Sequence, residues 1–538
     1  HSGFAPASPL SAGEPYTVRG HRILPVEVWP VAYDPLAGTL RLYSQVTFRL
    51  RLEGADMALT STLAQRYASP EFDQSLAQRV LNYNQGLALP EADGIGYLII
   101  TADAYYDAIL PLAELRTSRG FNVTVLSEPP GSTAQDIKDD IKLAYDTWDV
   151  PPSYLLLVGD TDTIPTWEGP EIKTSTDLYY ATMDGSDDWH PDLRRGRFPV
   201  RSAEQTTYMV DKYLAYATLT GVEPWLKTTS FAATCDTTYY PIAEATHDYV
   251  VENYTLPGGW SGSFPEDPQP GGDKLYCITY AATNQDLIDA FNQGRWAFVF
   301  SGHGNYDGWE TGFDPNVIRN LTNDGMFSFV ASHACLTGDF GEDEVFGETW
   351  VLQENTGALA FLGSSTNTYW DEDDMLERKY FDLLFSGAEP PVDISTMTDV
   401  GLAAVELTYP NMALYYWETY NILGDPAVKL FLQPDLPTFT LQVAPTSHDV
   451  CVSGQVSSTI EIGSALGYEE VVFLENSTPP DDVTASFDLP SSLVPFTSTF
   501  TLNVAPGALA GDDTIDITAT DSMEITQYSA VDLRIDTT

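Results

Sequence analysis

The segment "GYLIITADAYYDAILPLAELRTSRGFNVTVL", Gly96 to Leu126, decides the fold class of this chain of 538 residues. A short apolar run opens the segment, a helix-like stretch closed by Gly120 follows, and a second apolar run ends it. The same order continues directly, because "TAQDIKDDIKLAYDTW" (133–148) is typical of a helix and "SYLLLVGD" (153–160) of a buried strand. Strands and helices that alternate at this spacing predict an α/β fold, in which helices cover both faces of a parallel sheet.

The alternation returns in a second half of the chain. Five further strands are predicted, with helices such as "NQDLIDAFNQG" (284–294) between them: "TTSFAATCD" (228–236), "KLYCITYA" (274–281), "RWAFVFSGHG" (295–304), "FSFVASHAC" (327–335) and "GALAFLGSS" (357–365). Ligands collect at the carboxyl ends of strands in open parallel sheets. The residues that directly follow these strands are therefore the first candidates for a functional site.

The two ends of the chain have a β pattern. "HRILPVEVWPVAYDP" (21–35) and "GTLRLYSQVTFRLRLEG" (38–54) alternate apolar and polar residues around a turn signal, and 55–94 is less patterned, as in a linker. The last hundred or so residues contain short alternating strands, which predicts a β-sandwich of immunoglobulin-like type. We divide the chain into a β segment with its linker, two α/β subdomains and the sandwich, with bounds 1–80, 81–225, 226–432 and 433–538.

Composition narrows the classes of function. The chain has 77 acidic and 25 basic residues, and its formal net charge of -52 repels nucleic acid and anionic lipid while it favours divalent cations and basic ligands. No run of about 18 apolar residues is present, so a transmembrane segment is not expected. Four cysteines are too few for a disulfide scaffold and allow one or two bridges at most. Acidity, many Tyr, Thr and Ser residues and the C-terminal module predict a secreted or cell-surface protein.

Two strand ends carry the residues of a nucleophilic site. Cys335, in "FVASHACLTGDF" (329–340), and His303, in "FVFSGHGNYDGW" (298–309), each follow an apolar strand. A free thiol is mostly protonated at neutral pH and needs an adjacent imidazole to ionise. If the two strands are parallel neighbours, the two side chains meet at one edge of the sheet. We therefore expect Cys335 to be the nucleophile and His303 its base, with Asp236 as the residue that orients the imidazole.

The glycines that flank the histidine fit the same site. Gly302 and Gly304 are expected to let a substrate backbone approach, and the amides of Gly304 and Cys335 to face a developing oxyanion. Ser301 and His333 are placed in the wall of the substrate pocket. His333 is also a second candidate for the base, because it lies two residues before Cys335.

Each of these residues has a plainer interpretation by itself. A cysteine at a strand end is more often a small buried apolar residue, and an aspartate there is more often a cap or turn residue. Three such residues after three strands of one predicted sheet are much harder to attribute to chance. A metal site built from His303, His333 and Cys335 is a weaker alternative, because the paired ligand spacing of zinc sites is missing.

Four blocks of the sequence resemble signature blocks of the gingipain family of cysteine peptidases, which are relatives of caspases. They are the blocks at 298–309 and 329–340, "GALAFLGSSTNTYW" (357–370) and "YNILGDPAVKLF" (420–431), and the likeness covers residues 95 to 432 in order. The resemblance implies a caspase-like, mostly parallel sheet in two subdomains. It also implies that Cys335 attacks the scissile carbonyl, that His303 protonates the leaving amine, and that Asp236 is the third member.

The same resemblance supplies candidates for substrate recognition. Family members cleave after Arg or Lys, and they use an acidic residue and a tryptophan in the pocket for the residue before the cut (P1). Trp370 matches the tryptophan and Asp373 the acid of the lysine-cleaving branch, whereas Glu244 is a candidate for the acid of the arginine-cleaving branch. The run of acids at 371–374 is otherwise typical of the solvated start of a helix.

Calcium is the expected cofactor, in a structural role only. Gingipain relatives hold structural calcium, and "DGSDDW" (184–189) and "GDFGEDEVFG" (338–347) are oxygen-rich turns. Neither turn has the spacing of an EF-hand. No cofactor is expected to be required for the chemistry itself.

The main hypothesis is a secreted cysteine endopeptidase, made as a zymogen and acting on protein or peptide substrates. The N-terminal β segment resembles the family's propeptide and the C-terminal sandwich its immunoglobulin-like domain, so the chain's own N-terminal segment is a candidate inhibitor. Arg51, Arg66 or Arg79 would then enter the P1 pocket, with processing after Arg79. The alternatives are a non-catalytic adhesion protein with a degenerate peptidase-like domain, and a processing peptidase or transpeptidase of exported proteins.

Overall fold

The computed structural model describes residues 3–51, 53–54, 56–83, 94–341, 344–387, 391–432, 438–465, 468–522 and 526–536. Contacts between Cα atoms divide the chain into two compact units. One contains residues 1–219 and 223–432, and the other contains residues 220–222 and 433–538.

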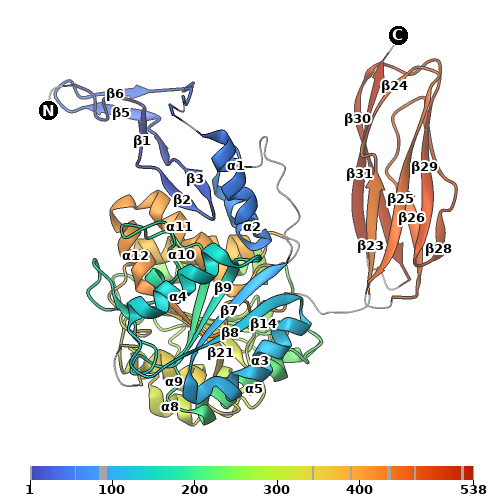
Figure 1. Ribbon diagram of the computed structural model, residues 1–538. Helices are drawn as coiled ribbons and strands as arrows, with labels where there is room; N and C mark the ends of the chain where they lie inside the picture. Colours follow the sequence, from blue (N-terminus) through green and yellow to red (C-terminus); the bar gives the residue numbers. More distant parts are fainter. Residues whose placement is uncertain are drawn as a thin grey trace. The chain divides into compact units, whose positions relative to one another are not determined.

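A ten-stranded sheet forms the centre of the first unit (Figure 1). Its strands, in spatial order, are β16 (Asp273–Tyr276), β13 (Ser230–Ala233), β17 (Ala297–Ser301), β20 (Ser328–His333), β21 (Ala358–Ser364), β22 (Tyr420–Leu423), β12 (Arg194–Phe198), β9 (Pro152–Val158), β7 (Ile95–Ala102) and β8 (Phe121–Glu128). Neighbouring strands are parallel except for β21 and β22, which are antiparallel. The sheet therefore consists of two parallel halves that run in opposite directions, and the predicted α/β class is confirmed.

Helices cover both faces of this sheet because the strands are apolar on both sides. In β7, Ile99 packs into one hydrophobic core with α3 and α5, while Leu98 and Ile100 pack into a second core with α4. The helices of the unit, apart from the two near the N-terminus, are α3 (Tyr106–Ser118), α4 (Ala134–Thr147), α5 (Ala203–Tyr216), α6 (Tyr240–Val250), α7 (Asn284–Asn292), α8 (Pro315–Arg319), α9 (Phe346–Leu352), α10 (Trp370–Leu384), α11 (Ile394–Thr408) and α12 (Ala413–Thr419).

The N-terminal segment contains three small antiparallel pairs and two helices. The pairs are β1 (Leu10–Ala12) with β4 (Val26–Val28), β2 (Tyr16–Val18) with β3 (His21–Ile23), and β5 (Val31–Asp34) with β6 (Thr39–Leu42). The turn expected at 34–38 joins β5 and β6, but β6 ends at Leu42, so the strand pattern predicted to continue to residue 54 does not form a strand over 43–51. The predicted linker contains α1 (Met57–Arg66) and α2 (Pro70–Arg79), and its part at 84–93 lies outside the described residues.

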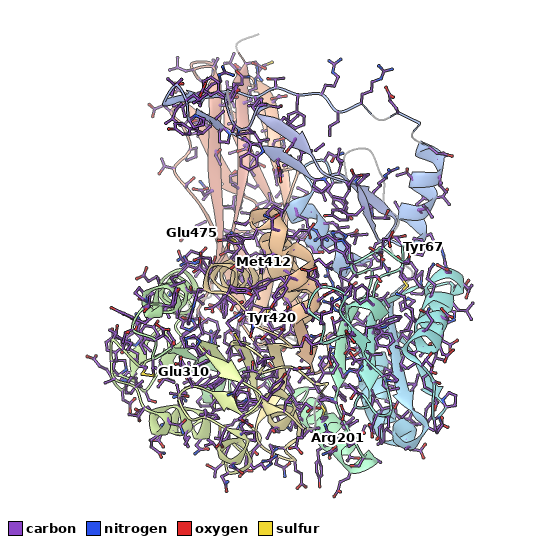
Figure 2. The ribbon with its side chains drawn as sticks, turned by 90° about the vertical axis from the view of Figure 1, so that its left-hand side faces the viewer. Tyr67, Arg201, Glu310, Met412, Tyr420 and Glu475 are labelled. Atoms are coloured by element: carbon purple, nitrogen blue, oxygen red, sulfur yellow. A yellow bond between two sulfur atoms is a disulfide. The ribbon has the colours of Figure 1, made fainter. Side chains whose placement is uncertain are left out.

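Arg19 anchors the N-terminal segment to the sheet. Its backbone N–H donates to Asp192 at 2.5 Å, and its buried guanidinium donates to the carbonyl of Pro152 at 2.7 Å and to that of Tyr67, which is labelled in Figure 2. The guanidinium also lies over the ring of Phe72 in α2. Pro152 begins β9, and because the two halves of the sheet run in opposite directions, this is the edge at which β17 and β20 end.

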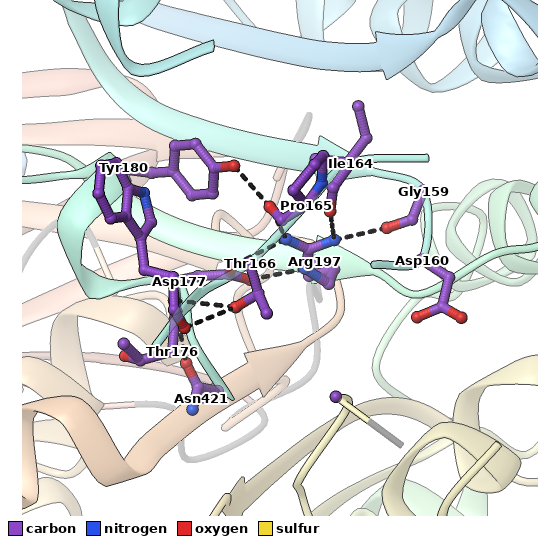
Figure 3. Close-up of polar contacts among 12 residues, drawn as sticks. Gly159, Asp160, Ile164, Pro165, Thr166, Thr176, Asp177, Tyr180, Arg197 and Asn421 are labelled. Atoms are coloured by element: carbon purple, nitrogen blue, oxygen red, sulfur yellow. Dashed lines mark hydrogen bonds and ion pairs between the residues drawn. The ribbon is translucent and has the colours of Figure 1, made fainter. Parts of the chain in front are cut away.

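Strand β12 lies inside the sheet although its sequence is Arg-Arg-Gly-Arg-Phe. The guanidinium of Arg197 pairs with Asp177 at 2.7 Å and donates to the carbonyls of Gly159 and Ile164, as Figure 3 shows. Arg194 and Arg195 both pair with Asp399 of α11. These bonds compensate the desolvation of the guanidinium groups, so the strand is buried without an apolar pattern.

The second unit is built from two antiparallel-rich sheets that share one hydrophobic core. One sheet has the order β23 (Thr438–Ala444), β25 (Gln455–Ala465), β29 (Phe496–Val504), β27 (Val483–Phe487), and the other has the order β24 (Ser447–Cys451), β31 (Thr526–Asp536), β30 (Gly511–Asp521), β26 (Val471–Asn476), β28 (Ser491–Leu493). The predicted strand-rich C-terminal module is present, and its immunoglobulin-like type stays a prediction. Among the described residues of the whole chain, no helix is both long enough and apolar enough to cross a membrane.

Candidate active site

Three neighbouring parallel strands end at the candidate site. In β13, β17 and β20 the residues Ala233, Ser301 and His333 lie side by side in register. Asp236, His303 and Cys335 follow these three strand ends within three residues. The expectation that the strands before His303 and Cys335 are parallel neighbours is confirmed.

A cavity of about 220 Å³ lies beyond these strand ends. It is lined by Gly302, His303, His333, Cys335, Asn367, Thr368, Tyr369, Trp370 and Asp373. The structure therefore brings the candidate nucleophile, its candidate base and three candidate pocket residues into one cavity. Asp236 and Gly304 are not among the lining residues, but Asp236 is hydrogen-bonded to His303 and Gly304 directly follows His303 in the sequence.

The imidazole of His303 is oriented by Asp236. Its Nε2 lies 3.0 Å from Oδ2 of Asp236, and because an ionised carboxylate only accepts, this nitrogen carries the proton and Nδ1 is left for exchange with the thiol. The hydrogen bond from His303, followed by the N–H of Thr238, lowers the pKa of Asp236. Asp236 is therefore ionised at neutral pH, as an orienting carboxylate has to be.

Cys335 is presented by a tight turn after β20. The next residue, Leu336, has a φ of 64°, in the left-handed region that residues other than glycine rarely occupy. The backbone N–H of Thr368 donates to Sγ of Cys335 at 3.4 Å. The sulfur is thereby held against the loop that follows β21.

The two glycines beside His303 are required by the protein itself. A Cβ on Gly302 would lie 2.7 Å from the ring of Phe300, and a Cβ on Gly304 would lie 2.7 Å from Cγ2 of Thr337 and 3.0 Å from Cβ of Ala334. The backbone of Gly304 thus packs directly on the residues that flank the cysteine. This packing is a reason for glycine that the sequence interpretation, which considered the approach of substrate, did not foresee.

Trp370 forms one wall of the site. Its ring stacks on Tyr239 with centroids 5.3 Å apart and meets the ring of His303 edge-on at 5.4 Å. Tyr239 in turn donates its backbone N–H to Asp236. The imidazole is therefore restrained by an aromatic face as well as by a carboxylate.

Asp373 lies at the buried end of the cavity lining. Its Oδ1 accepts hydrogen bonds from the hydroxyls of Tyr420, labelled in Figure 2, at 2.6 Å and of Tyr416 at 3.2 Å. Burial raises the pKa of Asp373 to about 7, although these hydroxyls act in the opposite direction. Of the four acids at 371–374, Asp373 is the one that lines the cavity, so the interpretation as a solvated helix start does not hold for it.

His333 is fully engaged beneath the cavity and is not placed as a base. Its Nδ1 lies 3.1 Å from the hydroxyl of Tyr420 and its Nε2 lies 3.1 Å from that of Tyr380. Since Tyr420 gives its one proton to Asp373, it accepts from Nδ1–H of His333, and Nε2 accepts from Tyr380. Burial lowers the pKa of His333 to about 4, so the ring is neutral. The hydrogen bonds of both ring nitrogens argue against His333 as the base and against a metal site of His303, His333 and Cys335.

Two predicted pocket residues lie elsewhere. Glu244 of α6 accepts from the hydroxyl of Thr279 at 2.5 Å and is not among the residues that line the cavity. The helix directs it to the loop after β16, so it is not an acid of this pocket. Ser301, the last residue of β17, is 6% exposed and is not part of the lining either.

The disulfide, and the described residues of the two turns predicted to bind calcium, do not line the cavity. Cys235 and Cys277 form a disulfide next to Asp236, while Cys335 and Cys451 carry thiol groups. In the first turn, carboxylate oxygens of Asp184 and Asp188 lie within 4.8 Å of one another and of an oxygen of Asp192. This oxygen set fits a divalent cation. In the second turn, residues 342 and 343 lie outside the described residues.

Sequence reasoning missed several residues of the site. Asn367, Thr368 and Tyr369 follow β21, the neighbour of β20, so the strand-end rule that found the cysteine would have found them. Tyr416 and Tyr420 carried no such signal, because α12 and β22 reach the site only through the tertiary fold.

Comparison with known proteins agrees with this arrangement. The sequence model of peptidase family C25 matches residues 91–431, which is more than half of the chain. Lys-gingipain HG66 of Porphyromonas gingivalis is 26% identical over 490 residues, which cover 82% of this chain and 27% of the relative. A gingipain R1 of the same organism is 25% identical over 488 residues, which cover 86% of this chain and 47% of the relative. The chain thus spans between about a quarter and a half of these curated relatives.

A solved structure shows the same fold. The crystal structure of the Arg-specific cysteine proteinase gingipain R superimposes with a TM-score of 0.56 at 21% identity, over 83% of this chain and 99% of that chain. The family match, the relatives and the fold agree with one another. The chain belongs to peptidase family C25.

Proposed function

We propose that this protein is a cysteine endopeptidase in which Cys335 is the nucleophile, His303 the general acid and base, and Asp236 the orienting carboxylate. The observation that carries the proposal is the shared cavity of Cys335 and His303, with the far nitrogen of His303 held by Asp236 at 3.0 Å. Hydrolysis of fluorogenic peptides by the wild type and by Cys335→Ala tests it.

Acylation follows from this geometry. The Cys335 thiol gives its proton to Nδ1 of His303, and the sulfur attacks the scissile carbonyl carbon as a thiolate. The amides of Gly304 and Cys335 are proposed to stabilise the oxyanion, in keeping with the packing of Gly304 against the turn that carries the cysteine. Collapse of the intermediate breaks the C–N bond, and His303 donates its proton to the leaving amine.

Deacylation reverses the proton transfers. Water replaces the amine, gives a proton to His303 and attacks the thioester, which releases the acid and the Cys335 thiol. A transpeptidase would use a second amine in place of water at this step. Supplying an added amine and resolving hydrolysed from aminolysed product distinguishes the two. A non-catalytic adhesion protein would not require the nucleophile, base and carboxylate to be arranged in this way.

The proposed P1 residue is Lys or Arg. A buried carboxylate at the end of the cavity, with one oxygen already held by two tyrosines, has its charge available for an ammonium or guanidinium group. Two relatives in sequence bear the names Lys-gingipain and gingipain R1. A secreted or cell-surface location is proposed from the charge of -52 and from the Cys235–Cys277 disulfide, since disulfides persist in oxidising surroundings.

The N-terminal segment is proposed to act as an inhibitory pro-segment. A solved complex of the pro- and mature domains of a Porphyromonas gingivalis relative has a TM-score of 0.55 with this chain. In this protein Arg19 fastens the segment to the edge of the sheet where β17 and β20 end. Docking at that edge would put the segment on the side of the sheet at which Cys335 and His303 follow their strands.

The three arginines that are candidates for processing differ in their surroundings. Arg66 donates to the carbonyls of Asp146 and Trp148 at the end of α4, and Arg79 is the last residue of α2. Neither lies in an irregular linker. The side chain of Arg51 is 86% exposed outside any helix or strand. Because a peptidase binds extended chain, α2 has to unfold before Arg79 is cleaved.

On incubation of the purified chain, we therefore expect cleavage after Arg51 to precede cleavage after Arg79. N-terminal sequencing and intact mass over time measure the order. The Cys335→Ala chain is expected to keep its N-terminus under the same conditions. A wild-type chain that stays intact, or a variant that is processed equally fast, would contradict autocatalytic processing.

Calcium is proposed to stabilise the turn of Asp184 and Asp188. Burial, and next the charge of Asp184, raise the pKa of Asp192 to about 8. A carboxyl group whose pKa is raised by folding costs stability as the pH rises from its usual pKa toward the raised one, because the folded chain retains a proton that the unfolded chain releases. A bound divalent cation would offset this cost.

We accordingly expect saturating calcium to raise the melting temperature by about 5 °C near pH 8, and by less near pH 5. Asp188→Asn should lose most of this increase. Asp187→Asn, in the same turn but outside the triplet, is the matched control. Equal melting temperatures in EDTA and in calcium would rule the site out. Thermal unfolding measures the stabilisation by bound calcium and does not depend on peptidase activity.

A further inference from the structure

We propose that Glu310 is a positioning residue, whose carboxylate fastens the loop of Asp236 to the loop of His303 so that the imidazole meets Cys335 in the cavity. Glu310, labelled in Figure 2, does not line the cavity itself. The inference deepens the peptidase proposal and rests on it for the kinetic measurements only.

A single oxygen of Glu310 joins the two loops. Its Oε1 accepts from the backbone N–H of His303 at 3.2 Å, from the backbone N–H of Cys235 at 3.2 Å, and from the hydroxyl of Thr234. The backbone N–H of Glu310 also donates to the carbonyl of His303 at 3.0 Å. Glu310 thus holds both polar groups of the His303 backbone and the two residues directly before Asp236.

The backbone that carries Glu310 is itself fixed. It follows a short hairpin of β18 (Gly304–Asn305) and β19 (Gly308–Trp309). The indole of Trp309 is 3% exposed and donates to the hydroxyl of Ser332 in β20 at 2.9 Å. The carboxylate is therefore presented from a rigid support, at a fixed distance from the strand that leads to Cys335.

Gly302 leaves the space through which this carboxylate reaches the loops. A Cβ at residue 302 would lie 2.9 Å from Oε1 of Glu310, closer than side chains pack. On its other side the Asp236 loop is tied down by the disulfide between Cys235 and Cys277. A covalent bond and a hydrogen bond thus converge on Cys235, the residue next to Asp236.

Such restraint matters because the side chain of His303 is exposed. It is 53% exposed, so packing alone does not fix the imidazole, and its position depends on Asp236 and on its own backbone. Misplacement of a catalytic group by about 1 Å can cost on the order of 10²-fold in rate. The loss is expected in the chemical step, because no bond to substrate is removed.

The kinetic experiment compares Glu310→Ala, Glu310→Gln and Asp307→Asn, the last being a control on the exposed turn of the same hairpin. For Glu310→Ala we expect kcat per titrated active site to fall by about 10- to 100-fold, with KM changed by less than about twofold. Glu310→Gln should stay within about threefold of wild type, since its amide oxygen accepts the same hydrogen bonds. Active sites are counted with an irreversible peptidyl inhibitor.

A second measurement requires no substrate. In a Cys451→Ser background, which removes the thiol of Cys451 from the assay, the alkylation rate of Cys335 by iodoacetamide is followed against pH. Glu310→Ala should slow alkylation near neutral pH and shift the profile toward that of a thiol without an imidazole partner. Because alkylation does not depend on a cleavable peptide, this result stands even if the peptidase proposal fails.

The outcomes distinguish a role of Glu310 in positioning His303 from a role in the stability of the fold alone. A lower melting temperature together with wild-type kcat per active site and a wild-type alkylation profile would overturn the proposal. A glutamine variant as impaired as the alanine variant would overturn the role of the three accepted hydrogen bonds. If Glu310→Ala does not fold, Glu310→Asp replaces it, because the shorter side chain withdraws the carboxylate from its donors.

Discussion

Replacing Cys335 by alanine is expected to lower kcat for peptide hydrolysis by at least about 10⁴-fold, because Cys335 is the cysteine among the described residues that line the cavity, and its thiolate forms the acyl-enzyme. The fold should be retained, since the side chain contacts the Thr368 backbone and makes no buried ion pair. Initial rates with a fluorogenic peptide, together with circular dichroism of the variant, measure the effect.

Cys451→Ser is the matched control for this prediction. Cys451 lies in the second unit, and its replacement should leave both kcat and KM unchanged. His303→Ala should approach the loss of Cys335→Ala, since the two side chains act as a unit. Residual hydrolysis in Cys335→Ala at a rate near wild type would show that the activity belongs to another site.

Asp373→Asn is expected to lower kcat/KM for substrates with P1 Lys or Arg by about 10²- to 10³-fold, because a basic side chain would enter the buried end of the cavity without a countercharge. Substrates with P1 Leu or Asn should lose far less. The hydroxyls of Tyr416 and Tyr420 can still donate to the amide oxygen, so the pocket keeps its shape. Peptides that end in Lys, Arg, Asn, Asp and Leu form the panel.

The pH dependence provides an internal check on the same residue. Burial raises the pKa of Asp373 to about 7, so the carboxyl group is neutral below that pH and charged above it. The ratio of kcat/KM for P1 Lys to that for P1 Leu should therefore rise with pH through this range and become flat in Asp373→Asn. Glu244→Gln, which changes an acid outside the cavity, should follow the wild-type ratio. A ratio independent of pH in the wild type would contradict the assignment.

The fold class could be predicted because its signal is local. In β7 and β9 the apolar residues are continuous, and Thr133 caps α4 with a capping box, so strand and helix are visible in the sequence itself. The sequence does not predict β12 as a strand, because its arginines are buried through ion pairs with Asp177 and Asp399, which lie elsewhere in the chain. The prediction of a linker at α2 is wrong, although Ser69 and Pro70 are typical of a helix start.

Prediction of the site had the same limits. Cys335 and His303 were found because each directly follows an apolar strand, and parallel strands end at a common edge. The sequence does not show which of the acids at 371–374 faces the site. Successive residues of a helix point to different sides, and only the tertiary fold sets which side faces the cavity. The sequence does not predict a role for Glu310. Neither its position in a loop nor its neighbours in sequence indicate which backbone groups its carboxylate contacts.

The amino-acid sequence by itself determined the alternation of strands and helices, the strand ends that carry the sulfur and the imidazole, and the acidic character of the chain. Periodicity and caps are properties of neighbouring residues, and they act wherever the segment lies. Only the tertiary structure decided that Asp373 faces the cavity between two tyrosines, that both nitrogens of His333 are occupied, and that Glu310 joins two loops. Burial and hydrogen bonding between distant segments exist only after the sheet has formed, and they set which side chains are charged and where they are held.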